Sequence, residues 1–327
     1  MIEKIEELMK DETAGDPITG LKWTRKATQK IADELSDLDI NVSRITVGKI
    51  LKQLDYSLKT NRKTISNGGK SRTKEEKKKR DDQFEYIKKM REACRKMNTP
   101  AISIDTKKKE LIGNFKNSGT RYKRGLDLTN DHDFLTYALG KAALYGVYDP
   151  EKNKGFVSIG MFLRDGNSIR SGDTPEFAVE SVERWWLNEG FQQYPNSKEI
   201  LILADSGGSN GHRPHMWKVK LQELLCDKYG MKVTVCHYPP GASKWNPIEH
   251  RLFSEISKNW QGTPLIDYET VLNYTLTTKT NTGLRVNAVL VEKEYQKGLS
   301  ASEEDLNNLN MERHEMNPLW NYTLSPN

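Results

Sequence analysis

The fold of this chain is decided by residues 200–256, which read ILILADSGGSNGHRPHMWKVKLQELLCDKYGMKVTVCHYPPGASKWNPIEHRLFSEI. The apolar run 200–204 predicts a buried strand, which ends at Asp205 and a glycine-rich loop. A helix over about residues 215–228, a second strand over 233–236 and, after the PPG break, a helix from Asn246 follow. Open α/β sheets bind ligands at the carboxyl ends of their strands, so Asp205 and the first-turn Glu249 are expected to converge there.

The composition of the whole chain predicts a basic protein with room for two domains. The 327 residues carry a net charge of +6, and 29% of them are charged against 35% that are hydrophobic. A basic excess of this size permits a polyanionic partner such as nucleic acid but does not require one. No apolar run reaches membrane-spanning length, and MIEKIEELMK at the start lacks the pattern of a signal peptide. The three cysteines match no common disulfide or zinc spacing, which favours a reducing cytoplasm.

Residues 1–65 are expected to form a small all-α domain. Apolar residues on one side of the segment 24–35 predict a helix, and Ser43 can cap a second helix that buries Val47 and Ile50. Two short helices joined by a tight turn fit a helix-turn-helix. Its second helix would present three polar residues to DNA: Arg44, Thr46 and Lys49. An ordinary helical hairpin fits the same pattern equally well.

Residues 66–99 are expected to form a basic linker helix. They overlap the charge run 59–80, and Thr73 to Glu76 reads as a capping box at the start of the helix. The helix is predicted to bury Phe84, Ile87, Met90, Cys94 and Met97. Four basic residues near its start are placed to follow DNA phosphates: Lys77, Lys78, Lys79 and Arg80. The alternative for such a run is a solvated linker without a partner.

Residues 100–300 change from helical to strand patterns. A strand over 101–105 ends on Asp105, and residues 110–115 extend it or pair with it. Strands over 143–148 and 155–161 are joined by a hairpin turn, and Thr174 caps a helix that runs to about residue 189. The resulting order, three strands and then helix, strand, helix, strand and helix, is that of the ribonuclease H-like fold, an α/β mixed sheet flanked by helices. Residues 301–327 remain as a C-terminal tail.

Three acids occupy informative positions in this order. Asp105 ends the first strand, Asp205 ends the fourth, and Glu249 begins the helix after the fifth. The first and fourth strands of this fold are neighbours, so the two aspartates are expected side by side. Carboxylates held together repel one another unless a cation neutralises them. Two divalent cations about 3.5 to 4 Å apart would do so and would support phosphoryl transfer.

Several segments resemble the Rhodopirellula-type DDE transposases of bacterial insertion sequences, distant relatives of the mariner-like group. The resemblance is carried by SIDTKKKELIGNFKN, YGVYD, EFAVESVERWW, LADSGGSNG, VTVCHYPPGASKWNPIEHRLF and WNYTLSP, and it covers nearly the whole chain. It implies cleavage of DNA at element ends and strand transfer into target DNA, with Mg²⁺ or Mn²⁺ as the metal. It assigns the catalytic and metal-binding acids to Asp105, Asp205 and Glu249. It further implies a homodimer or higher assembly on DNA, in a bacterial cytoplasm and at the nucleoid when DNA is bound.

Two features depart from the relatives. The interval between Asp205 and Glu249 is longer than in mariner-like proteins, and the DNA-binding region is short, as if an upstream helical module were absent. The first leaves the chemistry intact if the added residues form helix or loop, and the second weakens the expectation of autonomous end binding. Five residues near the acids in sequence are candidate phosphate contacts: Lys107, Lys108, His237, Lys244 and His250.

Each signal also has a structural alternative. Asp105 could cap a turn, and Glu249 could complete a capping box with Asn246. The loop after Asp205 lacks the ending of a phosphate-binding P-loop. A zinc site could be drawn from His212, His215, Cys236 and His237, and Trp245 and Trp260 could stack on bases or simply pack. At the level of function, the rivals are a catalytically silent DNA-binding regulator and a metal-dependent nuclease that cuts without joining.

Overall fold

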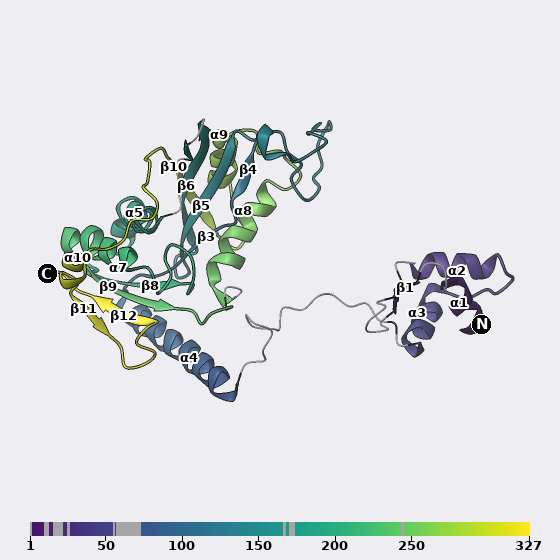
Figure 1. Ribbon diagram of the computed structural model, residues 1–327, viewed down its shortest axis with the longest axis horizontal. Coiled ribbons are helices and arrows are strands. Elements are labelled where there is room, and N and C mark those ends of the chain that lie inside the picture. Colours follow the sequence, from purple (N-terminus) through teal and green to yellow (C-terminus); the bar gives the residue numbers. More distant parts are fainter. Residues whose placement is uncertain are drawn as a thin grey trace. The chain divides into compact units, whose positions relative to one another are not determined.

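The chain forms two compact units, Met1–Ser71 and Arg72–Asn327, in the computed structural model (Figure 1). The structure describes residues 2–9, 13–15, 22–24, 27–54, 56, 73–165, 168–169, 174–242 and 245–327. The described elements of the first unit are α1 (Ile2–Met9), β1 (Thr13–Gly15), β2 (Lys22–Thr24), α2 (Thr28–Ser36) and α3 (Arg44–Gln53).

Three helices supply the core of the first unit. Ile5 of α1, Ile31 and Leu35 of α2, and Val47 of α3 are fully buried together. Ser43 caps α3 as predicted, because its hydroxyl accepts a 3.2 Å hydrogen bond from the backbone N–H of Thr46. The unit also contains an antiparallel pair, β1 with β2, that the all-α expectation did not include. Strands of three residues are too short to show an alternating pattern, and the helix expected from residue 24 begins at Thr28.

The second unit is built on a ten-stranded mixed sheet. Its strand order is β10-β6-β5-β3-β8-β9-β12-β11, with β4 paired to β5 and β7 paired to β6. The strands are β3 (Ala101–Thr106), β4 (Glu110–Ile112), β5 (Gly140–Asp149), β6 (Lys154–Asp165), β7 (Ser168–Ile169), β8 (Glu199–Ala204), β9 (Lys232–His237), β10 (Arg285–Val291), β11 (Met311–Arg313) and β12 (Asn321–Leu324). The described helices and helical turns are α4 (Lys74–Met97), η1 (Leu135–Tyr137), α5 (Pro175–Trp185), η2 (Trp186–Gly190), α6 (Phe191–Gln193), α7 (His215–Leu221), η3 (Gln222–Asp227), η5 (Glu249–Phe253), α8 (Ser254–Asn259), α9 (Tyr268–Leu276) and α10 (Glu303–Asn307).

The five central strands have the ribonuclease H-like arrangement that the sequence predicts. β3, β8 and β9 run parallel, while β5 runs antiparallel to both β3 and β6. Ile104 of β3 is in register with Ala204 of β8, so the residues that follow each of them end up at the same edge of the sheet. The segment expected to extend or pair with the first strand instead forms β4 and pairs with β5.

Helices cover both faces of this sheet (Figure 1). The alternating side chains of β3 and β8 divide between the faces, with Ile102 and Ile202 packed on the α5 and α7 side. Ala101 and Leu201 face the opposite side, where α4 packs through Ile87 and Cys94. Next to α4 on that side, η5, α8 and α9 pack against β5 and β6. The sheet is therefore buried on both faces and presents its strand ends for a site.

Two segments expected outside the catalytic domain pack with the sheet. The predicted linker helix is α4, whose capping box from Thr73 to Glu76 is confirmed. Its apolar face lies on β3 and β8, although Met97 is 60% exposed rather than buried because the helix ends at the next residue. The predicted C-terminal tail contributes β12, which pairs with β9 and buries Tyr322 and Leu324 completely. In the part of the chain that the structure describes, no helix is both long and apolar enough to cross a membrane.

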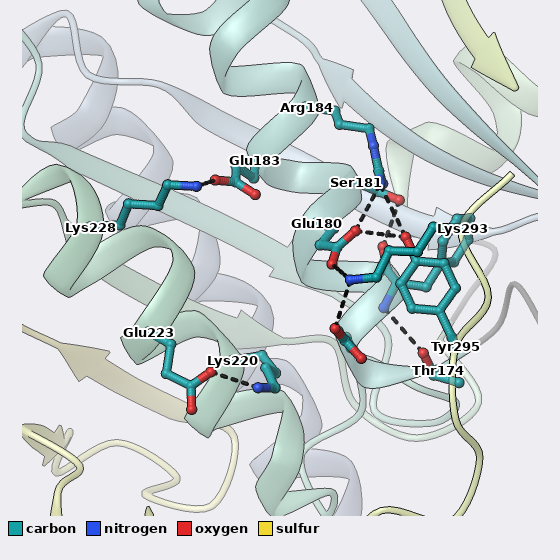
Figure 2. Close-up of polar contacts among 12 residues, drawn as sticks. Thr174, Glu180, Ser181, Glu183, Arg184, Lys220, Glu223, Lys228, Lys293 and Tyr295 are labelled. Carbon is teal, nitrogen blue, oxygen red and sulfur yellow. Dashed lines mark hydrogen bonds and ion pairs between the residues drawn. The ribbon is translucent and has the colours of Figure 1, made fainter. Parts of the chain in front are cut away.

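A network of charged and polar side chains connects the segment that follows β10 to α5 (Figure 2). The Glu180 carboxylate accepts hydrogen bonds from Arg184 at 2.7 Å and from the Tyr295 hydroxyl at 2.6 Å, and it also pairs with Lys293. On the other side of the helix, Glu183 pairs with Lys228 at 2.6 Å. The contacts with Tyr295, Lys293 and Lys228 connect α5 to segments that are far away in the sequence.

Candidate functional site

Two aspartates lie side by side at the carboxyl ends of β3 and β8. Burial and the negative charge of Asp205 raise the pKa of Asp105 to about 8, against the backbone N–H of Thr106, which lowers it. The charge of Glu249 and a hydrogen bond with its carboxyl group raise that pKa further. The pKa of Asp205 is also raised, by burial and by the charge of Glu249, while a hydrogen bond from Asn246 opposes the shift. The structure thus brings all three predicted acids together.

Asn246 links the three elements that carry these acids. Its amide nitrogen donates to the Asp205 Oδ1 atom and to the Ile104 carbonyl oxygen, both at 3.2 Å. Its amide oxygen accepts from the Ser103 hydroxyl, and that hydroxyl also receives the backbone N–H of Ile248 at 3.4 Å. Asn246 and Ser103 are completely buried. The sequence offered Asn246 only as a helix cap, and nothing in the pattern distinguished Ser103 from an ordinary strand residue.

The structure does not support a capping role for Glu249. The helix already includes Pro247 and Ile248 before the turn η5 begins at Glu249, and the described side-chain hydrogen bonds do not join the Glu249 carboxyl group to the backbone N–H of Asn246. The Glu249 carboxyl group instead lies close enough to Asp105 to raise the pKa of that aspartate.

The two aspartates line a cleft of about 350 Å³ with a basic wall. Its lining comes from the ends of β3 and β8 and the loops after them: Asp105, Thr106, Lys107, Lys108, Lys109, Asp205, Gly207, Gly208, Ser209 and Asn210. Lys107 pairs with Glu110 and lies 5.0 Å from the Trp260 ring centre, so its ammonium is engaged within the protein. Lys108 is exposed at the cleft. The buried Trp260 packs in the core, whereas Trp245 is 57% exposed.

His237 does not contact phosphates, contrary to the sequence-based expectation. The ring is fully buried, with Nδ1 3.0 Å from the Asp205 carbonyl oxygen and Nε2 3.4 Å from the Tyr322 hydroxyl. Burial lowers the pKa of His237 to about 3, so the imidazole is neutral at physiological pH. A neutral, buried ring cannot bind a DNA phosphate. The expectation rested only on the nearness of His237 to the acids in sequence.

The predicted DNA contacts on α4 differ in their exposure. Lys77, Lys78 and Lys79 are exposed on α4, although the Lys79 ammonium lies 4.9 Å from the Trp320 ring centre. Arg80 is half-buried and donates to the Pro240 carbonyl oxygen at 3.2 Å, so it is tied to the protein.

Arg44 and Lys49 are exposed on α3, while Thr46 is half-buried and bonded to Ser43. His250 is exposed on η5, beside Glu249 in sequence. Lys244 lies outside the described residues. These placements leave Arg44, Lys49, Lys77, Lys78, Lys108 and His250 accessible.

No preformed metal cluster exists among the residues that the structure describes. No three His, Cys, Asp or Glu side chains there are arranged to hold a metal ion, which removes the zinc alternative drawn from His212, His215, Cys236 and His237. The three acids are likewise not such a preformed group in the described part of the chain. Their donor chemistry nevertheless fits a hard divalent cation, since three carboxyl groups converge and burial disfavours their negative charge.

Comparisons with known proteins identify a family and two distant structural neighbours. A family model described as "Rhodopirellula transposase DDE domain" matches residues 4–326. Among solved structures, a Mos1 transposase paired-end complex with left transposon end is 13% identical with a TM-score of 0.41, over 84% of this chain and 69% of that chain. A Mos1 mariner paired-end complex with Mn is 12% identical with a TM-score of 0.41, over the same shares. A comparison with curated proteins gives no match.

The structural likenesses are weak, and the family model carries the assignment. Because that model spans almost the entire sequence, the three acids and the cleft belong to one continuous family domain. The chain is a member of the Rhodopirellula-type DDE transposases, a family of DNA transposases that implies the use of a divalent metal.

Proposed function

We propose that Asp105, Asp205 and Glu249 are the catalytic acids of a transposase that cuts DNA at element ends and joins those ends to target DNA. The observation that carries this proposal is the convergence of three carboxyl groups, from β3, β8 and η5, with both aspartates lining one cleft and the pKa of each raised. A structural role would not place buried like charges together, because their repulsion costs stability. Such an arrangement is typical of sites that bind cations.

The three carboxylates would hold the metal in this proposal. Two bound Mg²⁺ or Mn²⁺ ions would supply an activated water or 3′-hydroxyl and stabilise the leaving oxygen, as in other phosphoryl transfers. Each aspartate feels the negative charge of the other acids, so a bound cation would relieve the repulsion at both. Asn246 fixes one oxygen of Asp205 through its amide N–H and favours the charged form of that carboxylate. The site therefore acts by positioning and charge, without a covalent protein intermediate.

Accessible basic residues provide the DNA contacts. At the cleft, Lys108 and the glycine-rich loop after Asp205 face the space that a phosphate would enter. On the other unit, Arg44 and Lys49 expose one side of the capped helix α3 and would read element ends as a recognition helix. Lys77 and Lys78 on α4 would add sequence-independent phosphate contacts. Each chain has one acidic centre and an element has two ends, so we place at least two chains in the assembled complex.

The test is incubation with DNA that carries the element's own ends, with and without Mg²⁺ or Mn²⁺. We expect the parent to cut and join, and the Glu249→Gln variant to fold like the parent, bind DNA and cut at least 100-fold more slowly, because a neutral amide binds a hard cation poorly. Glu255→Gln is the matched control, because Glu255 pairs with Lys258 at 2.6 Å on the surface of α8. Cutting without joining would indicate a nuclease, and binding without cutting by the parent would indicate a DNA-binding regulator. Near-parental cutting by Glu249→Gln would remove Glu249 from the site.

A further inference from the structure

A series of hydrogen bonds between buried side chains supports the start of the loop that follows Asp205. At one end, the Asp205 carbonyl oxygen lies 3.0 Å from Nδ1 of His237. Nε2 of the same ring lies 3.4 Å from the Tyr322 hydroxyl, which in turn lies 3.0 Å from Nε1 of Trp217. The chain crosses from β9 to β12 and on to α7. All three side chains are fully buried.

The donors and acceptors of this chain allow only one arrangement. The indole N–H of Trp217 is a donor only, so it donates to the Tyr322 oxygen. A carbonyl oxygen is an acceptor only, so Nδ1 of His237 must carry the proton that bonds Asp205. Nε2 is then the acceptor, and the Tyr322 O–H is its donor. Each member therefore fixes the next, and the hydroxyl of a C-terminal strand selects the tautomer of the histidine.

The same loop is fastened by further bonds to its carbonyl groups. His212 Nδ1 lies 2.9 Å from the Ser206 carbonyl oxygen, and the buried Lys218 ammonium donates to the His212 carbonyl oxygen at 2.8 Å. At the start of the loop, the backbone N–H of Tyr238 donates to the Ala204 carbonyl oxygen at 2.8 Å. The bond from His237 is distinct among these because it falls on the residue that carries the carboxylate.

We infer that His237 is a positioning residue for Asp205, and that Tyr322 of β12 keeps it in the tautomer that donates to the Asp205 backbone. The inference rests on the proposed role of Asp205 as a catalytic acid. Groups of this kind, which orient a ligand without touching the metal, commonly change metal affinity or activity by about 10- to 100-fold when removed. The C-terminal strand would thereby control the catalytic aspartate from the opposite end of the sequence.

Two substitutions of His237 separate positioning from packing. In His237→Asn, the amide N–H stands near the place of Nδ1 and can still donate to the Asp205 carbonyl oxygen. In His237→Gln, the amide stands near the place of Nε2, so the bond to Tyr322 is kept and the bond to Asp205 is lost. Both variants remove the ring, so a purely structural role predicts equal effects.

We expect His237→Gln to need about 10-fold or more Mn²⁺ for half-maximal cutting and to show a weaker Mn²⁺-induced rise in Tm than the parent. The His237→Asn variant should stay within about threefold of the parent on both measures. Equal losses in the two variants, or a parental Mn²⁺ response in His237→Gln, would overturn the inference. The Asp205→Asn variant is tested in parallel. If this variant cuts DNA like the parent, Asp205 is not a catalytic acid, so the proposed function and the inference that rests on it both fail.

Tyr322→Phe tests the tautomer without removing a ring. We expect ¹⁵N spectra of the protein without metal to show the Nδ1–H form of His237 in the parent and a mixture in Tyr322→Phe. The same change should raise the Mn²⁺ requirement in the parent background but not in His237→Asn, where no tautomer exists to select. Such non-additivity marks coupled residues. An unchanged tautomer in Tyr322→Phe, or equal effects in both backgrounds, would contradict the role given to Tyr322.

Discussion

Asp105 lies where its own negative charge is disfavoured, since burial and two neighbouring acids act on one carboxyl group. The protein accepts this cost at the end of a core strand, one residue beyond the fully buried Ile104. A proton held on Asp105 relieves part of the repulsion. At the residue scale, the site is therefore a place of stored electrostatic strain, and its relief by protons or cations should be measurable in the stability of the protein.

The pH dependence of stability should reveal this strain. The pKa of Asp105 is about 8 in the folded protein against 3.8 for an unperturbed aspartate, so between these values the folded chain holds a proton that the unfolded chain has released. Stability contributed by that proton is present at acid pH and is lost as the pH rises from about 4 through 8. One pKa unit corresponds to about 1.4 kcal/mol, so even a partial shift is detectable.

Asp105→Asn should therefore lose less stability than the parent between pH 5 and pH 8.5. The lower value lies about one unit above the unperturbed pKa, and the upper value lies about half a unit above the pKa in the folded protein. The measurement is urea unfolding in the presence of a chelator. Asp131→Asn, which changes an exposed aspartate, is the control and should follow the parent. Parallel pH profiles for the parent and Asp105→Asn would show that Asp105 is ordinarily ionised. Added Mg²⁺ should stabilise the parent more than Asp105→Asn.

Asn246→Asp should destabilise the second unit in a pH-dependent way. Its amide nitrogen donates to the Asp205 carboxylate and the Ile104 carbonyl oxygen, so an ionised carboxyl group there would face two acceptors. We expect a loss of about 1–3 kcal/mol at pH 8, shrinking at acid pH, where a protonated carboxyl group can donate. Thermal melts at both pH values measure this. Asn188→Asp, on an exposed surface, should change stability less, and a pH-independent loss in Asn246→Asp would contradict the mechanism.

At the scale of elements, the sequence predicted what depends on local patterns. The run 200–204 and the segment 101–105 appear as β8 and β3 with their acids at the expected ends, because continuous apolar runs that stop at an acid mark buried strands. The capping residues Ser43, Thr73 and Thr174 each accept the expected backbone hydrogen bond for the same local reason.

Features set by distant partners could not be predicted. β12 is recognisable only through its pairing with β9, and β10 only through its parallel pairing with β6. The hydrogen bonds around the acids are also non-local, since Asn246 and Ser103 are bonded although 143 positions separate them in the sequence. His237 shows the limit most clearly, because nothing in its neighbours reveals that β12 closes over it. Sequence patterns identify the acids, whereas the residues that position them come from packing.

Glu180→Gln should weaken the attachment of the segment after β10 to α5. Burial alone raises the pKa of Glu180, but hydrogen bonds from Lys293 and Tyr295 outweigh it and hold the pKa below its usual range. The amide cannot balance Lys293 and Arg184, so we expect a loss of about 1–3 kcal/mol, below the range for fully buried pairs because Lys293 is partly exposed. Glu223→Gln breaks an exposed pair with Lys220 on α7 and should cost about 0–1 kcal/mol (Figure 2). Equal unfolding midpoints for the two variants would show that the Glu180 network adds no stability.

At the scale of the whole molecule, buried hydrogen bonds connect the first helix of the second unit, α4, to its last strand, β12. Gln83 of α4 exchanges amide hydrogen bonds with Asn321 of β12, at 2.7 and 2.8 Å, and also donates to the His237 carbonyl oxygen at 3.0 Å. All three residues are completely buried. The helix that precedes the sheet and the strand that ends the chain are therefore parts of one structure, which we propose as the boundary of the catalytic domain, residues 72–327.

Fragments of the chain should follow this boundary. A fragment of residues 72–327 should fold with a cooperative melt and keep Mg²⁺-dependent stabilisation, because both buried ends are present. Removal of residues 311–327 should leave β9 as an open edge and uncover the core sites of Tyr322 and Leu324, so that fragment should be insoluble or unfolded. Leu324→Ala in the longer fragment is a milder test, with an expected loss of about 2–5 kcal/mol by urea unfolding. If the fragment without 311–327 melts like the longer one, β12 is an appendage, and the control of Asp205 through Tyr322 cannot hold.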